Sequence, residues 1–131
     1  MGSFTDYWEN EILDHIFNKG AYTAPTVYVA LSTTTPLDDG TNVTEPAGGA
    51  YARVSTAAGD WNTAAGGLID NANAITFPEA TGSWGTITHF LLYDAASAGN
   101  AMAWGALTAS KAIGSGDTAR FAAGDLDVSL D

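Results

Sequence analysis

The stretch that most constrains the fold is Thr81–Thr108, in which two long apolar runs are joined by a turn of small residues. The runs Ile87–Tyr93 and Ala101–Leu107 are rich in aliphatic and aromatic residues and are bounded by Gly, Ser and Asn, which is typical of β-strands. Between them, the pair Gly99-Asn100 tolerates positive φ and so favours a reversal of the chain. The stretch therefore predicts a β-hairpin.

The first of these runs is apolar on both of its alternating faces. Ile87, Leu91 and Tyr93 fall on one phase, and Phe90 and Leu92 fall on the other. A strand without a polar face is typically buried on both sides. We therefore expect the hairpin to lie in the middle of the protein, with other segments packed over both of its faces.

The N-terminal segment 3–20 is predicted to form one amphipathic helix. Ser3 and Asp6 resemble a capping box, and Lys19-Gly20 is a typical helix stop. An isolated helix of this length is marginal in water, so its apolar stripe should pack on the protein's own sheet or on a partner subunit. The stripe supplies the candidate partner-contact residues, which are Trp8, Ile12, Leu13, Ile16 and Phe17.

The remaining segment, 24–131, is expected to be a β-sandwich with two long loops, at 33–49 and 57–73. Further short strands are predicted at residues 24–32, 51–56, 74–77, 111–113, 118–122 and 126–130. This number of short strands favours an antiparallel, jelly-roll-like sandwich over a closed barrel. A chain of 131 residues is long enough to bury a core of its own, so we expect a single domain spanning 1–131.

The charge balance excludes several classes of partner. The chain has 15 Asp and Glu residues against 4 Lys and Arg, a formal net charge of −11. Such a chain repels phosphate backbones and anionic lipid, so we expect neither nucleic acid nor membrane as a partner. It has no Cys, which excludes disulfides and thiolate chemistry, and neither a long apolar span nor a signal-peptide pattern is evident.

Side chains that could carry catalysis do not fall into a recognisable pattern. His15 lies in the predicted helix and His89 in the apolar strand, and neither has nucleophile or metal-ligand spacing around it. Glu45, Glu79 and Asp94 stand at strand ends and could pair as in glycoside hydrolases, but acids are abundant enough for this to arise by chance. The sequence therefore predicts no catalytic residue, and we expect the protein not to be an enzyme.

Two ligand-binding alternatives remain open at this point. Asp38, Asp39 and Asn42 could wrap a calcium ion, although their spacing does not match an EF-hand, and we predict neither a metal site nor a cofactor. Trp61 is expected to be a core anchor more than a ligand platform. It could instead line a shallow sugar site with other aromatic residues, namely Trp84 and Tyr51.

Three segments of the chain resemble one known family. FTDYWENEILDHIF (Phe4–Phe17), Tyr22–Val54 and Ala74–Leu130 are similar to small structural proteins of tailed bacteriophages, whose members often carry the label tail fibre protein or phage structural protein. The resemblance covers nearly the whole chain in the same element order and is weakest over Ser55–Asn73. It implies a non-enzymatic virion protein that is assembled in the cytoplasm of the bacterial host.

The resemblance leaves the place of attachment open. Our first hypothesis is a capsid decoration, or cement, protein on the particle exterior that stabilises the head. The alternative is a tail fibre, baseplate or collar accessory protein, or a carbohydrate-binding receptor module. Either attachment implies partners among the virion proteins, such as the major capsid protein or tail proteins, and multiple copies predict a homo-oligomer or contacts at a symmetry axis.

Overall fold

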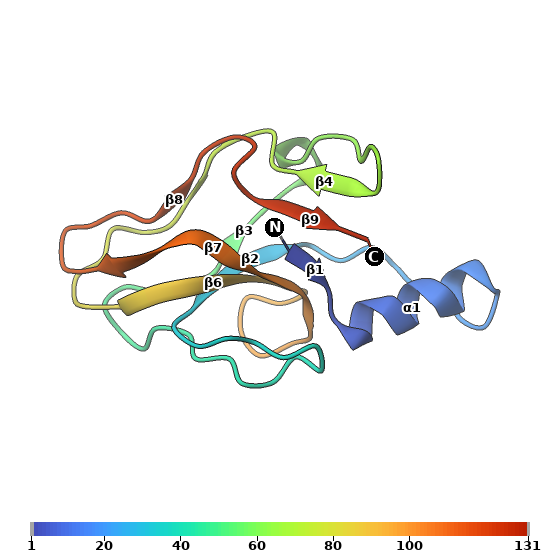
Figure 1. Cartoon of the computed structure of the whole chain (residues 1–131), viewed down its shortest axis with the longest axis horizontal. Helices are drawn as coiled ribbons and strands as arrows, with labels where there is room; N and C mark the ends of the chain where they lie inside the picture. Colours follow the sequence, from blue (N-terminus) through green and yellow to red (C-terminus); the bar gives the residue numbers. More distant parts are fainter. Residues whose placement is uncertain (1, 131) are drawn as a thin grey trace.

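The computed structural model describes residues 2–130, so the outermost residues of the expected domain 1–131 lie outside the described residues. The protein is mainly β with one α-helix near its N-terminus, as predicted. Its principal feature is a curled seven-stranded sheet in the order β3-β2-β6-β7-β1-β9-β4, accompanied by a two-stranded ribbon, β5-β8 (Figure 1). This arrangement is compatible with the expected sandwich.

The elements follow one another in a simple order. Strand β1 (Gly2–Phe4) leads into helix α1 (Asp6–Ile16), which is followed by β2 (Tyr28–Ser32), β3 (Val54–Ser55), the short 3₁₀-helix η1 (Ala58–Asp60), β4 (Leu68–Asp70) and β5 (Ile75–Thr76). The hairpin strands β6 (Gly85–Tyr93) and β7 (Ala101–Ile113) come next, followed by β8 (Arg120–Phe121) and β9 (Asp127–Ser129).

The predicted hairpin is the centre of the sheet, with β2 paired to the outer side of β6 and β1 to the outer side of β7. Residues 101–107 and 111–113, which were expected as separate strands, belong to the single strand β7. The reversal is closed by Asp94, whose carboxylate accepts hydrogen bonds from the backbone N–H and the side-chain amide of Asn100 at 2.7 and 2.9 Å. Ala98 and Gly99, rather than Asn100, take positive φ.

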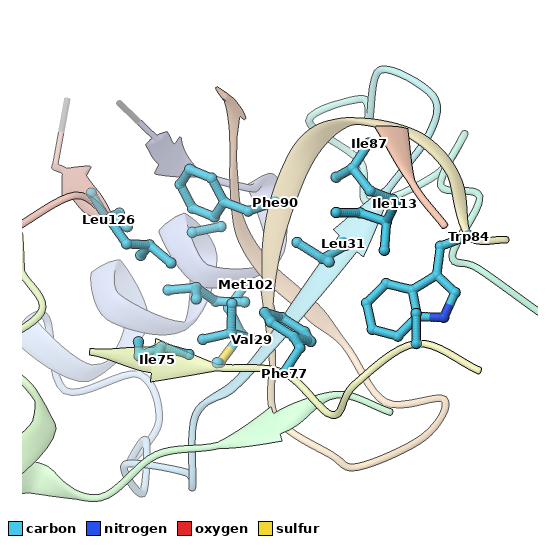
Figure 2. Close-up of a cluster of buried hydrophobic side chains, with 14 residues drawn as sticks. Val29, Leu31, Ile75, Phe77, Trp84, Ile87, Phe90, Met102, Ile113 and Leu126 are labelled. Atoms are coloured by element: carbon cyan, nitrogen blue, oxygen red, sulfur yellow. The ribbon is translucent and has the colours of Figure 1, made fainter. Parts of the chain in front are cut away.

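Strand β6 is buried on both faces, but one residue lies on the other face from the one predicted. Ile87 and Phe90 belong to the main core cluster (Figure 2), as does Leu92. Leu91 and Tyr93 belong to a smaller cluster on the opposite side. The cause is a register shift between Ile87 and His89, because a β-bulge changes the alternation of side chains along a strand.

The expected helix 3–20 is too long at both ends. Residues 2–4 form a strand instead, and the N-cap is Thr5, whose hydroxyl donates to the carbonyl oxygen of Ala101 at 2.7 Å rather than to the helix. The predicted capping box of Ser3 and Asp6 therefore does not form. At the other end, Asn18 has φ 60°, and the backbone N–H of Lys19 returns to the carbonyl of Asp14 at 2.7 Å, which ends the helix before Gly20.

Strand β1 also makes one pairing that departs from the expected antiparallel arrangement. It lies antiparallel to β7 but parallel to β9, so the N-terminal and C-terminal strands are neighbours in the sheet (Figure 1). Gly2 permits the close approach, since a Cβ there would lie 2.8 Å from Cζ of Phe90 and 2.9 Å from the carbonyl oxygen of Trp104. The helix is positioned on the sheet by this strand.

The two expected loops differ from each other. Segment 33–49 contains no strand and is tied to itself by hydrogen bonds such as that from Thr33 N–H to the Thr44 carbonyl, at 3.0 Å. Segment 57–73 is partly regular, because it includes η1 and the edge strand β4. The buried Asn71 fixes this segment, since its side chain donates to the carbonyl of Ala122 and accepts from the N–H of Leu126, both at 2.9 Å.

Candidate interaction surface

The first half of α1 is docked on the protein's own sheet. The rings of Phe4 and Trp8 lie 4.3 Å apart, and both residues pack against the main core cluster. The indole N–H of Trp8 donates to the hydroxyl of Tyr22 at 3.1 Å, and that hydroxyl lies 3.6 Å from the sulfur of Met102. Trp8 therefore anchors the helix, while Ile12 is half-buried beside it.

The second half of α1 extends beyond the sheet (Figure 1). Leu13 is 54% exposed, Ile16 is 64% exposed and Phe17, at the end of the helix, is 71% exposed. Exposed large apolar side chains that are adjacent on a helix are typical of a surface that packs against another molecule. The five candidate contact residues thus divide into an internal anchor, Trp8, a half-buried neighbour, and three side chains that the described residues leave largely uncovered.

Acidic residues surround this helix. Asp6, Glu9, Glu11 and Asp14 lie within α1, whereas Lys19 follows its end. The apolar end of the helix is therefore surrounded by negative charge. A partner surface with an apolar recess and positively charged residues around it would be complementary to this end.

Beside the docked half of α1 is an apolar groove with a cavity volume of about 360 Å³. Trp8 and Trp61 supply its two aromatic side chains, and Asn62 and Thr63 are its polar lining residues. The other lining residues are aliphatic and come from parts of the chain that lie outside α1: Val27, Ala58, Ile69, Leu92 and Val128. Sequence reasoning missed this groove, because only the tertiary fold brings these residues together and Trp61 was expected to be a core anchor.

The aromatic residues proposed for a sugar site do not converge. Trp84 is 3% exposed, and its indole N–H donates to the carbonyl of Gly49 at 2.8 Å. Tyr51 packs edge-on against Trp84 with ring centroids 5.3 Å apart, whereas Trp61 lines the groove beside α1. Trp84 is consequently not available to a ligand, so these three aromatic residues do not form one sugar platform.

Glu45, the first of the carboxylates considered for hydrolysis, is part of a partly buried ion pair. Its Oε2 lies 2.7 Å from Nη2 of Arg53, and its Oε1 accepts from the hydroxyl of Tyr51 at 2.7 Å. Arg53 also donates to the carbonyl of Ala95 at 2.8 Å and lies over the ring of Tyr93, 3.6 Å from the centroid. Burial opposes ionisation of Glu45, but the hydrogen bonds from Arg53 and Tyr51 outweigh it and lower the pKa of this carboxyl.

This cluster ties two loops together and is not arranged for proton transfer. The same network raises the pKa of Tyr51, first through burial and then through its hydrogen bond to Glu45. Of the other carboxylates considered, Asp94 is engaged in the hairpin turn and Glu79 is exposed.

The two histidines serve local contacts. His89 is half-buried, its Nδ1 lies 2.8 Å from the hydroxyl oxygen of Thr88, and its ring is 5.8 Å from that of Trp104. Burial lowers the pKa of His89. The Nδ1 of His15 accepts a hydrogen bond from the backbone N–H of Tyr22 at 3.2 Å.

The acids of the 33–49 loop also serve the backbone around them. The carboxylate of Asp39 accepts from the N–H and hydroxyl of Thr41 at 2.9 and 2.6 Å, that of Asp38 accepts from the indole of Trp104 at 3.2 Å, and the side chain of Asn42 donates to Thr35. Over residues 2–130, no group of three or more His, Cys, Asp or Glu side chains is placed to hold a metal ion. The same residues include no helix with the length and hydrophobicity that crossing a bilayer requires.

Comparison with known proteins identifies the kind of molecule to which these surfaces belong. Residues 3–129 match a family model described as Podophage GP4 fiber I protein gp80. The match spans the helix and the curled sheet except for Gly2 of β1. It also covers the segment 55–73, over which the resemblance from sequence was weakest. A search of curated proteins gave no significant match.

Proposed function

The chain belongs to the family of podophage GP4 fiber I protein gp80, and from this premise we propose that it is a structural subunit of the fibre apparatus of a phage particle. The family makes it a bacteriophage virion structural protein, as the sequence resemblance implied. Tail-fibre attachment, which was our alternative hypothesis, fits the family description better than capsid decoration does. The subunit works as a single domain, and its place of action is the assembled virion.

The observation that carries this proposal is the exposed end of α1. Trp8 holds the helix on the sheet, and the helix then presents Leu13, Ile16 and Phe17 to the outside. A side chain such as Phe17 is stabilising only once it is covered, so the helix end is suited to attachment to another virion protein. Several copies attached in this way would form a homo-oligomer or meet at a symmetry axis of the particle.

The proposed role is mechanical and not enzymatic. Glu45 and Asp94 are held in structural hydrogen bonds, and the Glu45–Arg53 pair ties the 33–53 region to the hairpin loop through Ala95 and Ala98. A subunit of this kind contributes rigid surfaces, so its attachment is decided by shape, apolar area and charge. Its partners are other proteins of the virion.

Labelling of intact particles tests the proposal. Gold-conjugated antibodies against this chain should mark the tail or the fibres emerging from the tail vertex. Labelling spread over the whole icosahedral head would support capsid decoration instead. Purified particles that lack the chain altogether would contradict both placements.

A further inference from the structure

We propose that the groove between Trp8 and Trp61 binds an apolar side chain from an extended segment of another virion polypeptide, and that Lys or Arg residues flank this anchor. The inference deepens the proposed function, on which it rests for the statement that the partner is a virion protein.

The size and lining of the groove match one large apolar side chain and its neighbours. Its cavity of about 360 Å³ is lined by Val27, Leu92 and Val128 together with the two indoles. Pockets that hold a buried anchor in protein interfaces are of this kind, because an aliphatic or aromatic side chain gains most when water is excluded from all of its surface.

Three of the polar groups around the groove are already engaged within the chain. The indole N–H of Trp8 donates to Tyr22, and that of Trp61 donates to the hydroxyl of Thr56 at 2.9 Å. The side-chain amide of Asn62 donates to the carboxylate of Asp70 at 2.9 Å. A ligand rich in hydroxyl groups, such as a sugar, would find few free donors here, whereas an apolar side chain needs none.

The apolar stripe of α1 leads from the groove towards the exposed end of the helix. Trp8 lines the groove, and Ile12 follows it one helical turn later on the same face, towards Ile16. A partner segment anchored in the groove can therefore extend along the helix and cover its apolar end. This continuity makes the groove and the helix end one binding surface.

The rim of the groove determines the charge of the partner. Three carboxylates neighbour its lining residues: Glu11 lies one turn from Trp8 on α1, Asp60 directly precedes Trp61, and Asp70 accepts from the side-chain amide of Asn62. Asp60 and Asp70 are bonded to neutral donors, so those contacts do not compensate their negative charge. None of the lining residues is basic. A partner segment with Lys or Arg beside its anchor would be attracted, and an acidic segment would be repelled.

The charges around the groove also disfavour α1 of a second copy of this chain as the segment that binds there. Its apolar end, at Ile16 and Phe17, has the right chemistry for the groove, but Glu9, Glu11 and Asp14 would accompany it. Those carboxylates would approach Asp60 and Asp70, which neighbour the lining residues Trp61 and Asn62. Like charges brought together across an interface are unfavourable, so the occupant we propose is a different, basic chain.

Site-specific cross-linking in assembled particles tests the proposal. Thr63 lines the groove and is exposed, so Thr63→p-benzoylphenylalanine places a photoreactive group at its mouth. Ser115→p-benzoylphenylalanine, in the exposed turn after β7, is the matched control. After irradiation of purified virions, mass spectrometry should identify a cross-link at position 63 to a segment with an apolar residue and nearby Lys or Arg, and position 115 should not give it.

The outcomes separate the inference from the proposed function. A cross-link from position 63 to an acidic segment or to α1 of another copy, or no cross-link although the variant is present in particles, would overturn the inference alone. Absence of the wild-type chain from particles would overturn the proposed function.

If the Thr63 variant does not assemble into particles, binding of peptides to the purified wild-type chain tests the proposal. Two twelve-residue peptides would share a central Phe, flanked in one by four Lys and in the other by four Glu. We expect the Lys peptide to shift the NMR signals of the Trp8 and Trp61 indole N–H groups and to bind at least about fivefold more tightly, as two or three exposed ion pairs would give. Equal responses to both peptides, or no response to either, would contradict the proposal.

Discussion

Removing the apolar end of α1 should abolish attachment while leaving the fold intact. We consider the double variant Ile16→Gln/Phe17→Gln, which keeps good helix propensity at Ile16. Complete burial of an Ile or Phe side chain contributes about 1.5–3 kcal/mol. Because Ile16 is 64% and Phe17 is 71% exposed, roughly two thirds of that gain, or about 1–2 kcal/mol for each residue, is left for a partner to realise.

The expected loss of partner affinity is therefore about 2–4 kcal/mol, which corresponds to roughly 30-fold to 1,000-fold. The free energy of unfolding of the isolated chain should change by less than about 1 kcal/mol, since most of the removed surface is already in water. Particles assembled in the presence of equal amounts of wild-type and variant chains would be purified, and the ratio of the two chains determined by quantitative mass spectrometry. We expect the wild-type chain to predominate by more than tenfold.

Leu37→Gln provides the matched control. Leu37 is 50% exposed, close to the 54% of Leu13, but it lies in the 33–49 loop and not on the helix. It should be incorporated as well as the wild-type chain. The reasoning is refuted if the double variant is incorporated equally well while remaining folded, or if Leu37→Gln is excluded to the same extent. Thermal unfolding of each purified chain separates a loss of attachment from a loss of fold.

Further predictions concern the structure that supports this surface. Glu45→Gln should destabilise the chain by about 1–3 kcal/mol at pH 7 in chemical denaturation, because it removes the charge that pairs with the partly buried Arg53. Since the folded-state pKa of Glu45 is lowered, its contribution should be present above the unfolded pKa of about 4.3 and be lost as pH falls through the folded pKa, and the variant should lack this part of the acid dependence. Asn71→Ala should cost about 2–3 kcal/mol and speed hydrogen exchange of the Leu126 amide, which loses its acceptor. Gly2→Ala should cost about 1–3 kcal/mol and weaken the pairing of β1, as seen in amide exchange, because the new methyl group would lie 2.9 Å from a backbone carbonyl oxygen.

The parts of the fold that sequence predicted are those that local pattern specifies. The hairpin was predicted because Ile87–Tyr93 and Ala101–Leu107 are rich in aliphatic and aromatic residues. The first run is apolar on both of its alternating faces, which is typical of a strand buried on both sides. The helix was predicted because its apolar residues recur at helical spacing. Its start was wrong because Gly2–Phe4 is drawn into the sheet by β7 and β9, which lie about a hundred residues away in sequence.

Strand β4 was missed for a related reason. Leu68–Asp70 carries only a weak strand pattern within a segment rich in Ala, Gly and Asn, and it becomes a strand through pairing with β9. Asn71, directly after it, is then buried and bonded to the 122–126 segment. Sequence reasoning treated 57–73 as an irregular crossover, because nothing local indicates a partner so distant along the chain.

For the candidate surface, too, sequence predicted what depends on neighbouring residues and missed what depends on residues far apart along the chain. The exposed helix end was predictable from one amphipathic stripe, whereas the groove depends on five separate parts of the chain meeting beside Trp8. Trp8 connects them, since its ring packs on Phe4, its N–H binds Tyr22 and its remaining surface lines the groove. A partner that fills the groove would therefore press on the residue that holds the helix in place. Binding of a partner in the groove should then favour a fixed position of the helix end, and a fixed helix end should favour binding in the groove. Both depend on the position of the Trp8 side chain.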